Sequence, residues 1–110
     1  MAGLLTVPSS GETALIRHIV FFSARDRNGV EVVRDGLKAL GAIPHSRVFE
    51  VVLNSKVDPL SDEVDVVVYA EFEDEGALAA YKAHPLYAET TRKVRPLREL
   101  RLSADIHSPG

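Results

Sequence analysis

The sequence contains no cysteine, which excludes disulfide bonds and thiolate metal sites. It also lacks an excess of positive charge, since 13 Lys and Arg residues face 16 Asp and Glu residues and the formal net charge is −3. An acidic chain is not attracted to nucleic acid or to an anionic membrane over long range. No segment approaches the roughly 20 apolar residues that span a bilayer. We therefore expect a cytoplasmic protein with neither nucleic acid nor membrane as a partner.

The common cofactor motifs are missing as well. There is no glycine-rich phosphate loop and no nucleophile elbow. The histidines show no HxH or HxxxH spacing; they are His18, His45, His84 and His107. We therefore expect no bound cofactor and no metal site, although a magnesium ion held by oxygen ligands stays open.

What remains is a chain of 110 residues with 45% hydrophobic residues, enough for one domain. Residues 1–14 are predicted to be a flexible N-terminal leader and 107–110 a loose tail, leaving a domain over 15–106. Within it, residue periodicity predicts strands over 15–24, 47–53, 64–72 and 99–106. It also predicts a helix over 30–40 and a second helical region over 75–94, broken at His84-Pro85.

Helix boundaries are marked by capping residues. Asn28, with Glu31 three residues later, predicts a capping box at the start of the first helix, and Gly41 predicts its end. Asp74 is the predicted N-cap of the second helix, and Pro85 suits the first turn of its continuation.

The order β-α-β-β-α-β predicts an α+β, ferredoxin-like fold with a four-stranded antiparallel sheet. Two helices can cover only one face of such a sheet. The first strand places Ile19 and Phe21 on the other face, which is too apolar to remain in water. We therefore expect the chain to pair with a second copy of itself through the face that carries Ile19 and Phe21.

The last strand alternates between apolar and polar residues. We expect the first set to point inward: Leu100, Leu102, Ala104 and Ile106. We expect the second set to point outward: Glu99, Arg101, Ser103 and Asp105. A basic run precedes and overlaps this strand, and we interpret it as a solvated face: Arg92, Lys93, Arg95, Arg98 and Arg101.

Three segments resemble one known family. IRHIVFF (16–22), DVVVYAEFED (65–74) and ALAAYKAHP (77–85) are similar to the first strand, third strand and second helix of the stress-responsive dimeric α/β-barrel proteins. The resemblance covers about 16–106 and implies a homodimer whose two sheets form a β-barrel. Many such proteins have no assigned activity and are linked to stress responses. Some plant members are cofactor-free polyketide cyclases, and related barrels include small monooxygenases acting on aromatic polyketides.

The cyclase pattern is a His in the first strand followed by Tyr-x-x-His-Pro-x-His. His18, Tyr81, His84 and Pro85 match it, but Tyr87 stands at the final His. The resemblance would make that final His the proton acceptor, so Tyr87 argues against cyclase activity.

The resemblance implies that His18 and Tyr81 are the catalytic candidates. An imidazole can exchange a proton near neutral pH, and a tyrosine hydroxyl can donate a hydrogen bond to a carbonyl oxygen that gains negative charge. Together they could enolise a substrate carbonyl. Alternatively, His18 is a core histidine bonded to backbone, and Tyr81 packs its ring in the core.

A small apolar or aromatic ligand would contact five further residues: Val20, Phe22, Leu78, His84 and Tyr87. His84 is better explained as a cap at the helix break, and Tyr87 could line a pocket or its rim. The sequence therefore favours a homodimeric, stress-associated domain with a small apolar ligand pocket in each subunit. The alternatives are a cofactor-independent enzyme of the polyketide cyclase or small aromatic monooxygenase type, and a dimer whose interior is filled by side chains.

Overall fold

The computed structural model describes residues 15–108 and confirms an α+β domain with a four-stranded antiparallel sheet. The strands are β3 (Ile16–Ala24), β4 (Val48–Leu53), β5 (Val66–Phe72) and β6 (Arg98–His107). The helices are α2 (Val30–Leu37), α3 (Glu75–Ala83) and α4 (Pro85–Val94). The predicted leader lies outside the described residues, and so do the last two residues of the predicted tail. His107 belongs to β6 and pairs with Ile16, so the tail begins later than expected.

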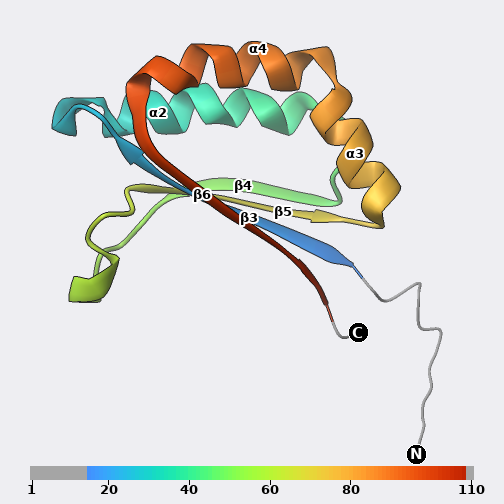
Figure 1. Ribbon diagram of the computed structural model, residues 1–110, viewed down its shortest axis with the longest axis horizontal. Helices are drawn as coiled ribbons and strands as arrows, with labels where there is room; N and C mark the ends of the chain where they lie inside the picture. Colours follow the sequence, from blue (N-terminus) through green and yellow to red (C-terminus); the bar gives the residue numbers. More distant parts are fainter. Residues whose placement is uncertain (1–14, 109–110) are drawn as a thin grey trace, which may run out of the picture.

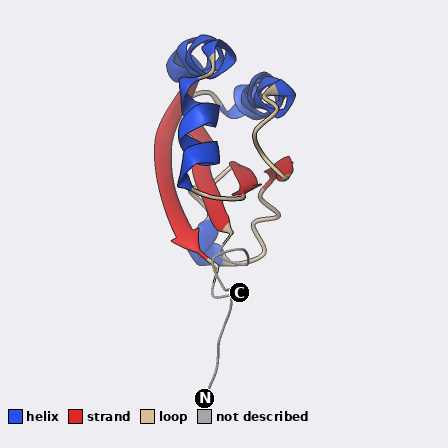
Figure 2. Ribbon diagram, turned by 90° about the vertical axis from the view of Figure 1, so that its right-hand side faces the viewer, coloured by secondary structure: helices blue, strands red, loops and turns tan. Residues whose placement is uncertain are grey.

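The strands are ordered β4-β5-β3-β6, with β3 and β5 in the centre. The helices lie together on one side of this sheet, where α2 packs against α4 (Figures 1 and 2). Burial alternates along both central strands, because successive side chains of a strand point to opposite faces. The buried side chains of β3 and β5 therefore meet α2 and α4 to form the core.

The first helix begins differently from the prediction. The cap is Asp26, whose side chain accepts a hydrogen bond from Asn28 N and starts a 3₁₀ turn over Arg27–Gly29. α2 follows at Val30 and ends at Leu37, where it tightens into a 3₁₀ helix over Lys38–Ala42. The prediction of Asn28 as N-cap was wrong because Asp26 offers the same type of side-chain acceptor two residues earlier.

Gly41 lies inside the 3₁₀ segment that follows α2. A Cβ atom at this position would lie 3.0 Å from Cδ2 of Phe49. The glycine therefore permits the Phe49 ring to pack against the end of the helical segment, and its role is close approach to β4.

The caps of the later helices agree with the sequence. Asp74 accepts a hydrogen bond from Ala77 N at 2.8 Å and caps α3. α3 ends at Ala83, and Pro85 occupies the first turn of α4. His84 Nδ1 accepts a hydrogen bond from Leu86 N at 3.1 Å, so His84 caps α4.

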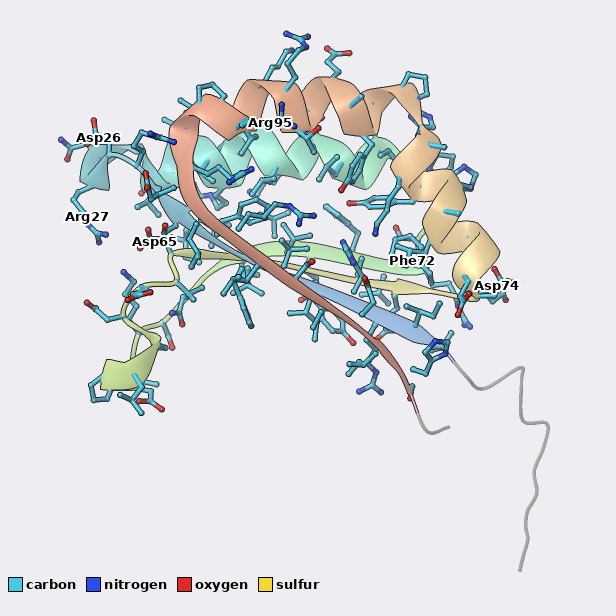
Figure 3. All side chains as sticks on the ribbon, viewed as in Figure 1. Asp26, Arg27, Asp65, Phe72, Asp74 and Arg95 are labelled. Carbon is cyan, nitrogen blue, oxygen red and sulfur yellow. The ribbon has the colours of Figure 1, made fainter. Side chains whose placement is uncertain are left out.

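Asp65 joins three segments at the opposite end of the sheet from Asp74 (Figure 3). Its buried carboxylate accepts hydrogen bonds from Ala24 N at 2.8 Å and from Lys56 Nζ at 2.6 Å. Arg27 lies 3.5 Å away. The carboxylate thus fixes the end of β3 against the linker between β4 and β5, and its desolvation is offset by charge-assisted hydrogen bonds.

The face assignment predicted for β6 was wrong. His18 pairs with Asp105, Val20 with Ser103 and Phe22 with Arg101, so the polar residues of β6 share the helix-covered face of the sheet. Leu102 and Ile106 point to the other face and are 57% and 46% exposed. The alternating pattern defines two faces of a strand but does not say which face meets the helices.

The face opposite the helices carries apolar side chains from all four strands. Phe21 lies opposite Val67 on one neighbouring strand and opposite Leu102 on the other. Val67 in turn lies opposite Val52. Phe21 is 38% exposed and Val52 is 46% exposed. We call this surface, made of Phe21, Val52, Val67, Leu102 and Ile106, the outer face. Among the described residues, no helix is long and apolar enough to cross a membrane.

Candidate functional site

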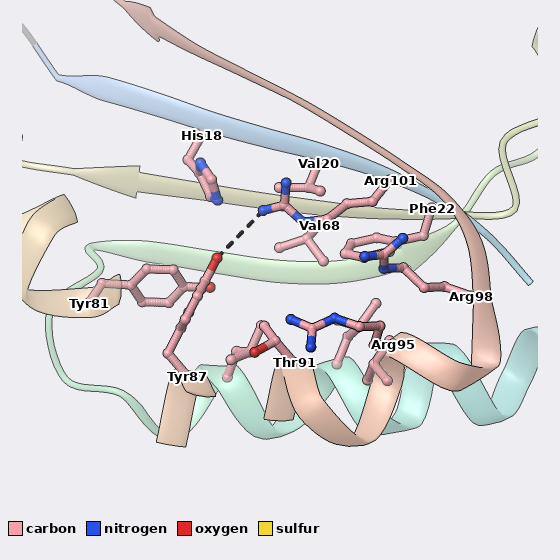
Figure 4. A pocket seen from close by; sticks show the side chains of 13 residues that line it. His18, Val20, Phe22, Val68, Tyr81, Tyr87, Thr91, Arg95, Arg98 and Arg101 are labelled. Atoms are coloured by element: carbon pink, nitrogen blue, oxygen red, sulfur yellow. Dashed lines mark hydrogen bonds between the residues drawn. The ribbon is translucent and has the colours of Figure 1, made fainter. Parts of the chain in front are cut away.

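A cavity of about 320 Å³ lies between the sheet and the helices (Figure 4). The sheet contributes residues of β3, β5 and β6, and the helical layer contributes residues of all three helices and the segments after α2 and α4. The lining residues are His18, Val20, Phe22, Leu37, Leu40, Val68, Tyr81, Tyr87, Thr91, Val94, Arg95, Arg98 and Arg101. The volume is at the low end of the range for small-molecule sites, so the space suits a small ligand.

The structure brings together five of the seven predicted site residues: His18, Val20, Phe22, Tyr81 and Tyr87. Leu78 and His84 are not on the cavity wall. Leu78 packs against the core, and His84 turns its Nδ1 to the start of α4 as a cap. The side chain of His84 is therefore occupied as the helix cap at the break between α3 and α4.

His18 is 2% exposed, and its Nδ1 lies 2.5 Å from Oδ1 of Asp105 on the neighbouring strand. Burial lowers the pKa of His18 below its usual value, although the hydrogen bond and the negative charge of Asp105 oppose this shift. The imidazole is therefore neutral at pH 7. In the tautomer in which Nδ1–H donates a hydrogen bond to Asp105, Nε2 carries the lone pair and can accept a proton.

Tyr81 lies beside His18, with ring centroids 6.0 Å apart, and beside Tyr87, with centroids 5.3 Å apart. Burial is the main cause that raises the pKa of Tyr81, so its hydroxyl keeps its proton. Among the described residues, no partner accepts a hydrogen bond from this hydroxyl. A protonated tyrosine that lines a cavity beside a neutral histidine can donate to a carbonyl oxygen of a bound molecule.

Sequence reasoning missed the arginines of the cavity. Arg95, Arg98 and Arg101 were interpreted as part of a solvated face, yet all three line the space (Figure 4). Arg98 and Arg101 are half-buried, and Arg101 lies 3.5 Å from the Tyr87 hydroxyl. Their three-residue spacing in β6 and the preceding turn held no recognisable motif. The inverted faces of β6 explain the position of Arg101, a register shift in the pairing of β3 with β6 separates Arg98 from it, and Arg95 is exposed at the rim.

Metal ligation finds no support in the described part of the chain. No group of three or more His, Asp or Glu side chains there could hold a metal ion. The polar groups that line the cavity are an imidazole, two phenols, a hydroxyl and three guanidinium groups.

One protein family matches the chain over residues 16–108, and its description is "Stress responsive A/B Barrel Domain". No curated protein matches the chain. The matched segment includes every strand and helix of the described structure, from β3 to β6.

Solved structures resemble the chain over most of its length. A Dabb family protein with a ferredoxin-like fold from Mesorhizobium loti is 27% identical, with a TM-score of 0.72 over 88% of this chain and 99% of that one. A dimeric ferredoxin-like protein of unknown function from Thermobifida fusca is 24% identical, with a TM-score of 0.73 over 88% and 93%. A Nitrosomonas europaea protein, provisionally assigned as an antibiotic biosynthesis monooxygenase, is 16% identical, with a TM-score of 0.70 over 87% and 91%.

Proposed function

The chain belongs to the stress-responsive A/B barrel domain family, and we propose that it acts as a homodimer that holds one small, largely apolar ligand in the cavity of each subunit. The cavity itself carries this proposal. Its walls combine aliphatic and aromatic side chains with a few polar groups, which is the usual composition of a small-molecule site. A domain whose interior served only packing would be filled by side chains at this position.

The dimer is supported by the outer face. Phe21, Val52, Leu102 and Ile106 are each more than a third exposed, and no helix within residues 15–108 covers them. The similar protein from Thermobifida fusca is described as dimeric. A second copy related by a two-fold axis would bury this face against itself, and two such sheets would form the barrel that the family name describes.

Ligand binding is tested with an uncharged aromatic probe, naphthalene-2-carboxamide. We expect NMR shift changes at the cavity residues, and Thr91→Trp should weaken binding about 10-fold by filling the space. The matched control is Ala88→Trp, an exposed position of the same helix that does not line the cavity. Shift changes scattered over the surface, or equal binding by both variants, would contradict the proposed pocket.

The pair formed by His18 and Asp105 favours a second candidate function, a cofactor-independent enzyme that removes a proton next to a carbonyl group. Asp105 orients the imidazole and stabilises the cation that forms when Nε2 accepts a proton. Tyr81 is close enough to donate a hydrogen bond to the enolate oxygen of the same substrate. These two roles are those of a general base and an oxyanion donor.

This second function is tested by exchange of the methyl protons of acetophenone in deuterated buffer, followed by NMR. We expect His18→Gln to slow the protein-dependent exchange about 100-fold and Tyr81→Phe to slow it about 10-fold. The control is His45→Gln, because His45 is an exposed imidazole outside the cavity. Exchange that survives both substitutions, or that falls equally in the control, would exclude this pair as the acid-base machinery.

A further inference from the structure

The three arginines of the cavity are unusual for their lack of carboxylate partners. Arg95, Arg98 and Arg101 contribute three positive charges, and the lining includes no Asp or Glu. Among the described residues, none of the three guanidinium groups lies within 4.0 Å of a carboxylate. The chain as a whole carries a net charge of −3, so the concentration of positive charge is local to this space.

Converging like charges in a partly buried space is unfavourable unless an anion offsets them. The protein has many carboxylates available for such pairs, as Arg25 with Glu99 and Lys93 with Glu89 demonstrate elsewhere. Arg98 and Arg101 are half-buried on the helix-covered side of the sheet, where Arg101 pairs in register with Phe22. Their charges thus face the cavity.

Arg95 and Arg98 lie apart from His18 and Tyr81, whereas Arg101 reaches the Tyr87 hydroxyl beside them. In Figure 4, His18, Tyr81 and Tyr87 lie at one end and Arg95 and Arg98 at the other, with the Arg101 guanidinium extending between them. Val20, Phe22 and Val68 form the apolar wall along which a ligand would lie. The cavity therefore has an apolar wall with a cationic end.

From this arrangement we propose that the ligand carries an anionic oxygen head group, a carboxylate or a phosphate, which is bound by Arg95, Arg98 and Arg101 while its apolar part lies along β3 and β5. This inference rests on the proposed ligand pocket. A guanidinium presents two parallel N–H donors that match the two oxygens of such a group. The head group would also orient the ligand, because two of the three arginines, Arg95 and Arg98, lie at the same end of the cavity.

The test compares naphthalene-2-carboxylate with naphthalene-2-carboxamide, which has nearly the same shape without the charge, and with 2-naphthyl phosphate. Binding is followed by naphthalene fluorescence, which the protein does not obscure because it contains no tryptophan. We expect at least one anion to bind about 10-fold more tightly than the carboxamide in low salt, and NaCl at about 0.2 M to reduce this difference. The stronger of the two anions identifies the head group.

The variants are Arg98→Gln and Arg101→Gln, with Arg92→Gln as the matched control on the exposed part of α4. We expect each cavity variant to weaken anion binding about 10-fold and to weaken carboxamide binding by much less, and the control to change neither. Equal binding of all three probes would overturn the anion site and leave the ligand pocket intact. Binding of none would overturn both the anion site and the proposed pocket.

Discussion

His18 and Asp105 are 87 residues apart in the sequence and adjacent in the sheet. Their pairing depends on the register between β3 and β6, which places the two residues directly opposite each other. The sequence could identify His18 through its resemblance to a first-strand histidine, but no local pattern connects it with Asp105. Long-range strand pairing supplies the partner, and for this reason the dyad could not be predicted.

The stability of the protein should depend on pH through His18. Burial lowers its pKa in the folded state, while the unfolded chain keeps a value near 6.5. Just below about pH 6.5 the unfolded chain therefore binds more protons, so the free energy of unfolding falls as the pH decreases. In urea titrations at fixed protein concentration, His18→Gln should flatten this dependence between about pH 7.5 and 5. Parallel curves for the two proteins would show that His18 does not titrate in this way.

Cap residues and prolines predicted the helices well, since they act through their own sequence neighbours. Asp74 and the His84-Pro85 break behave as expected. The apolar stripe predicted for the first helix is buried at Val33 and Leu37 in α2 and at Leu40 in the 3₁₀ helix after it. The predicted cap of the first helix was wrong because two possible acceptors, Asp26 and Asn28, lie two residues apart, and Asp26 is the one that caps. Capping residues and prolines thus predicted which segments are helical, but they did not decide between two possible caps close together in the sequence.

The cap of α4 gives a prediction at the scale of one element. His84→Ala removes the acceptor for Leu86 N and should lower the free energy of unfolding by about 1 kcal/mol, measured by urea titration at pH 7.5. Naphthalene-2-carboxamide binding should not change, because His84 is not on the cavity wall. His45→Ala, at an exposed histidine, should alter stability by less than about 0.5 kcal/mol. A loss of binding without a loss of stability would instead return His84 to the site.

At the scale of the whole molecule, β6 is where sequence analysis and structure diverge. Its alternation was recognised correctly, but the apolar side was assigned to the interior of a single subunit. That assignment assumed that apolar residues face the helices. In the structure, Leu102 and Ile106 lie on the outer face, while Arg101 lines the cavity. Hydrophobic patterning reports burial in the complete assembly, and the proposed dimer would bury the apolar side of β6 that a single subunit leaves exposed.

Assembly is tested at Leu102. Leu102→Asp should convert a dimer into a monomer in sedimentation experiments, because it leaves an unpaired charge within the proposed interface. The subunit should still fold, since Leu102 is already 57% exposed in the single chain. Val32→Asp is the matched control, because Val32 is 54% exposed on α2, away from the sheet. A dimer that persists in Leu102→Asp would place the subunit contact elsewhere.

The alternation of β6 makes the protein sensitive to the deletion of a single residue from this strand. Arg101 lines the cavity, and Asp105 contacts His18 on the same face of the sheet. Leu102 and Ile106 follow these two residues along β6 and belong to the outer face. The side-chain period of a strand is two, so deleting a single residue from β6 would exchange the two sets. Leucines would then enter the cavity and charged groups would emerge on the opposite surface. The proposed ligand contacts and the proposed subunit contacts thus depend on the same strand register, and a shift of one residue would disrupt both.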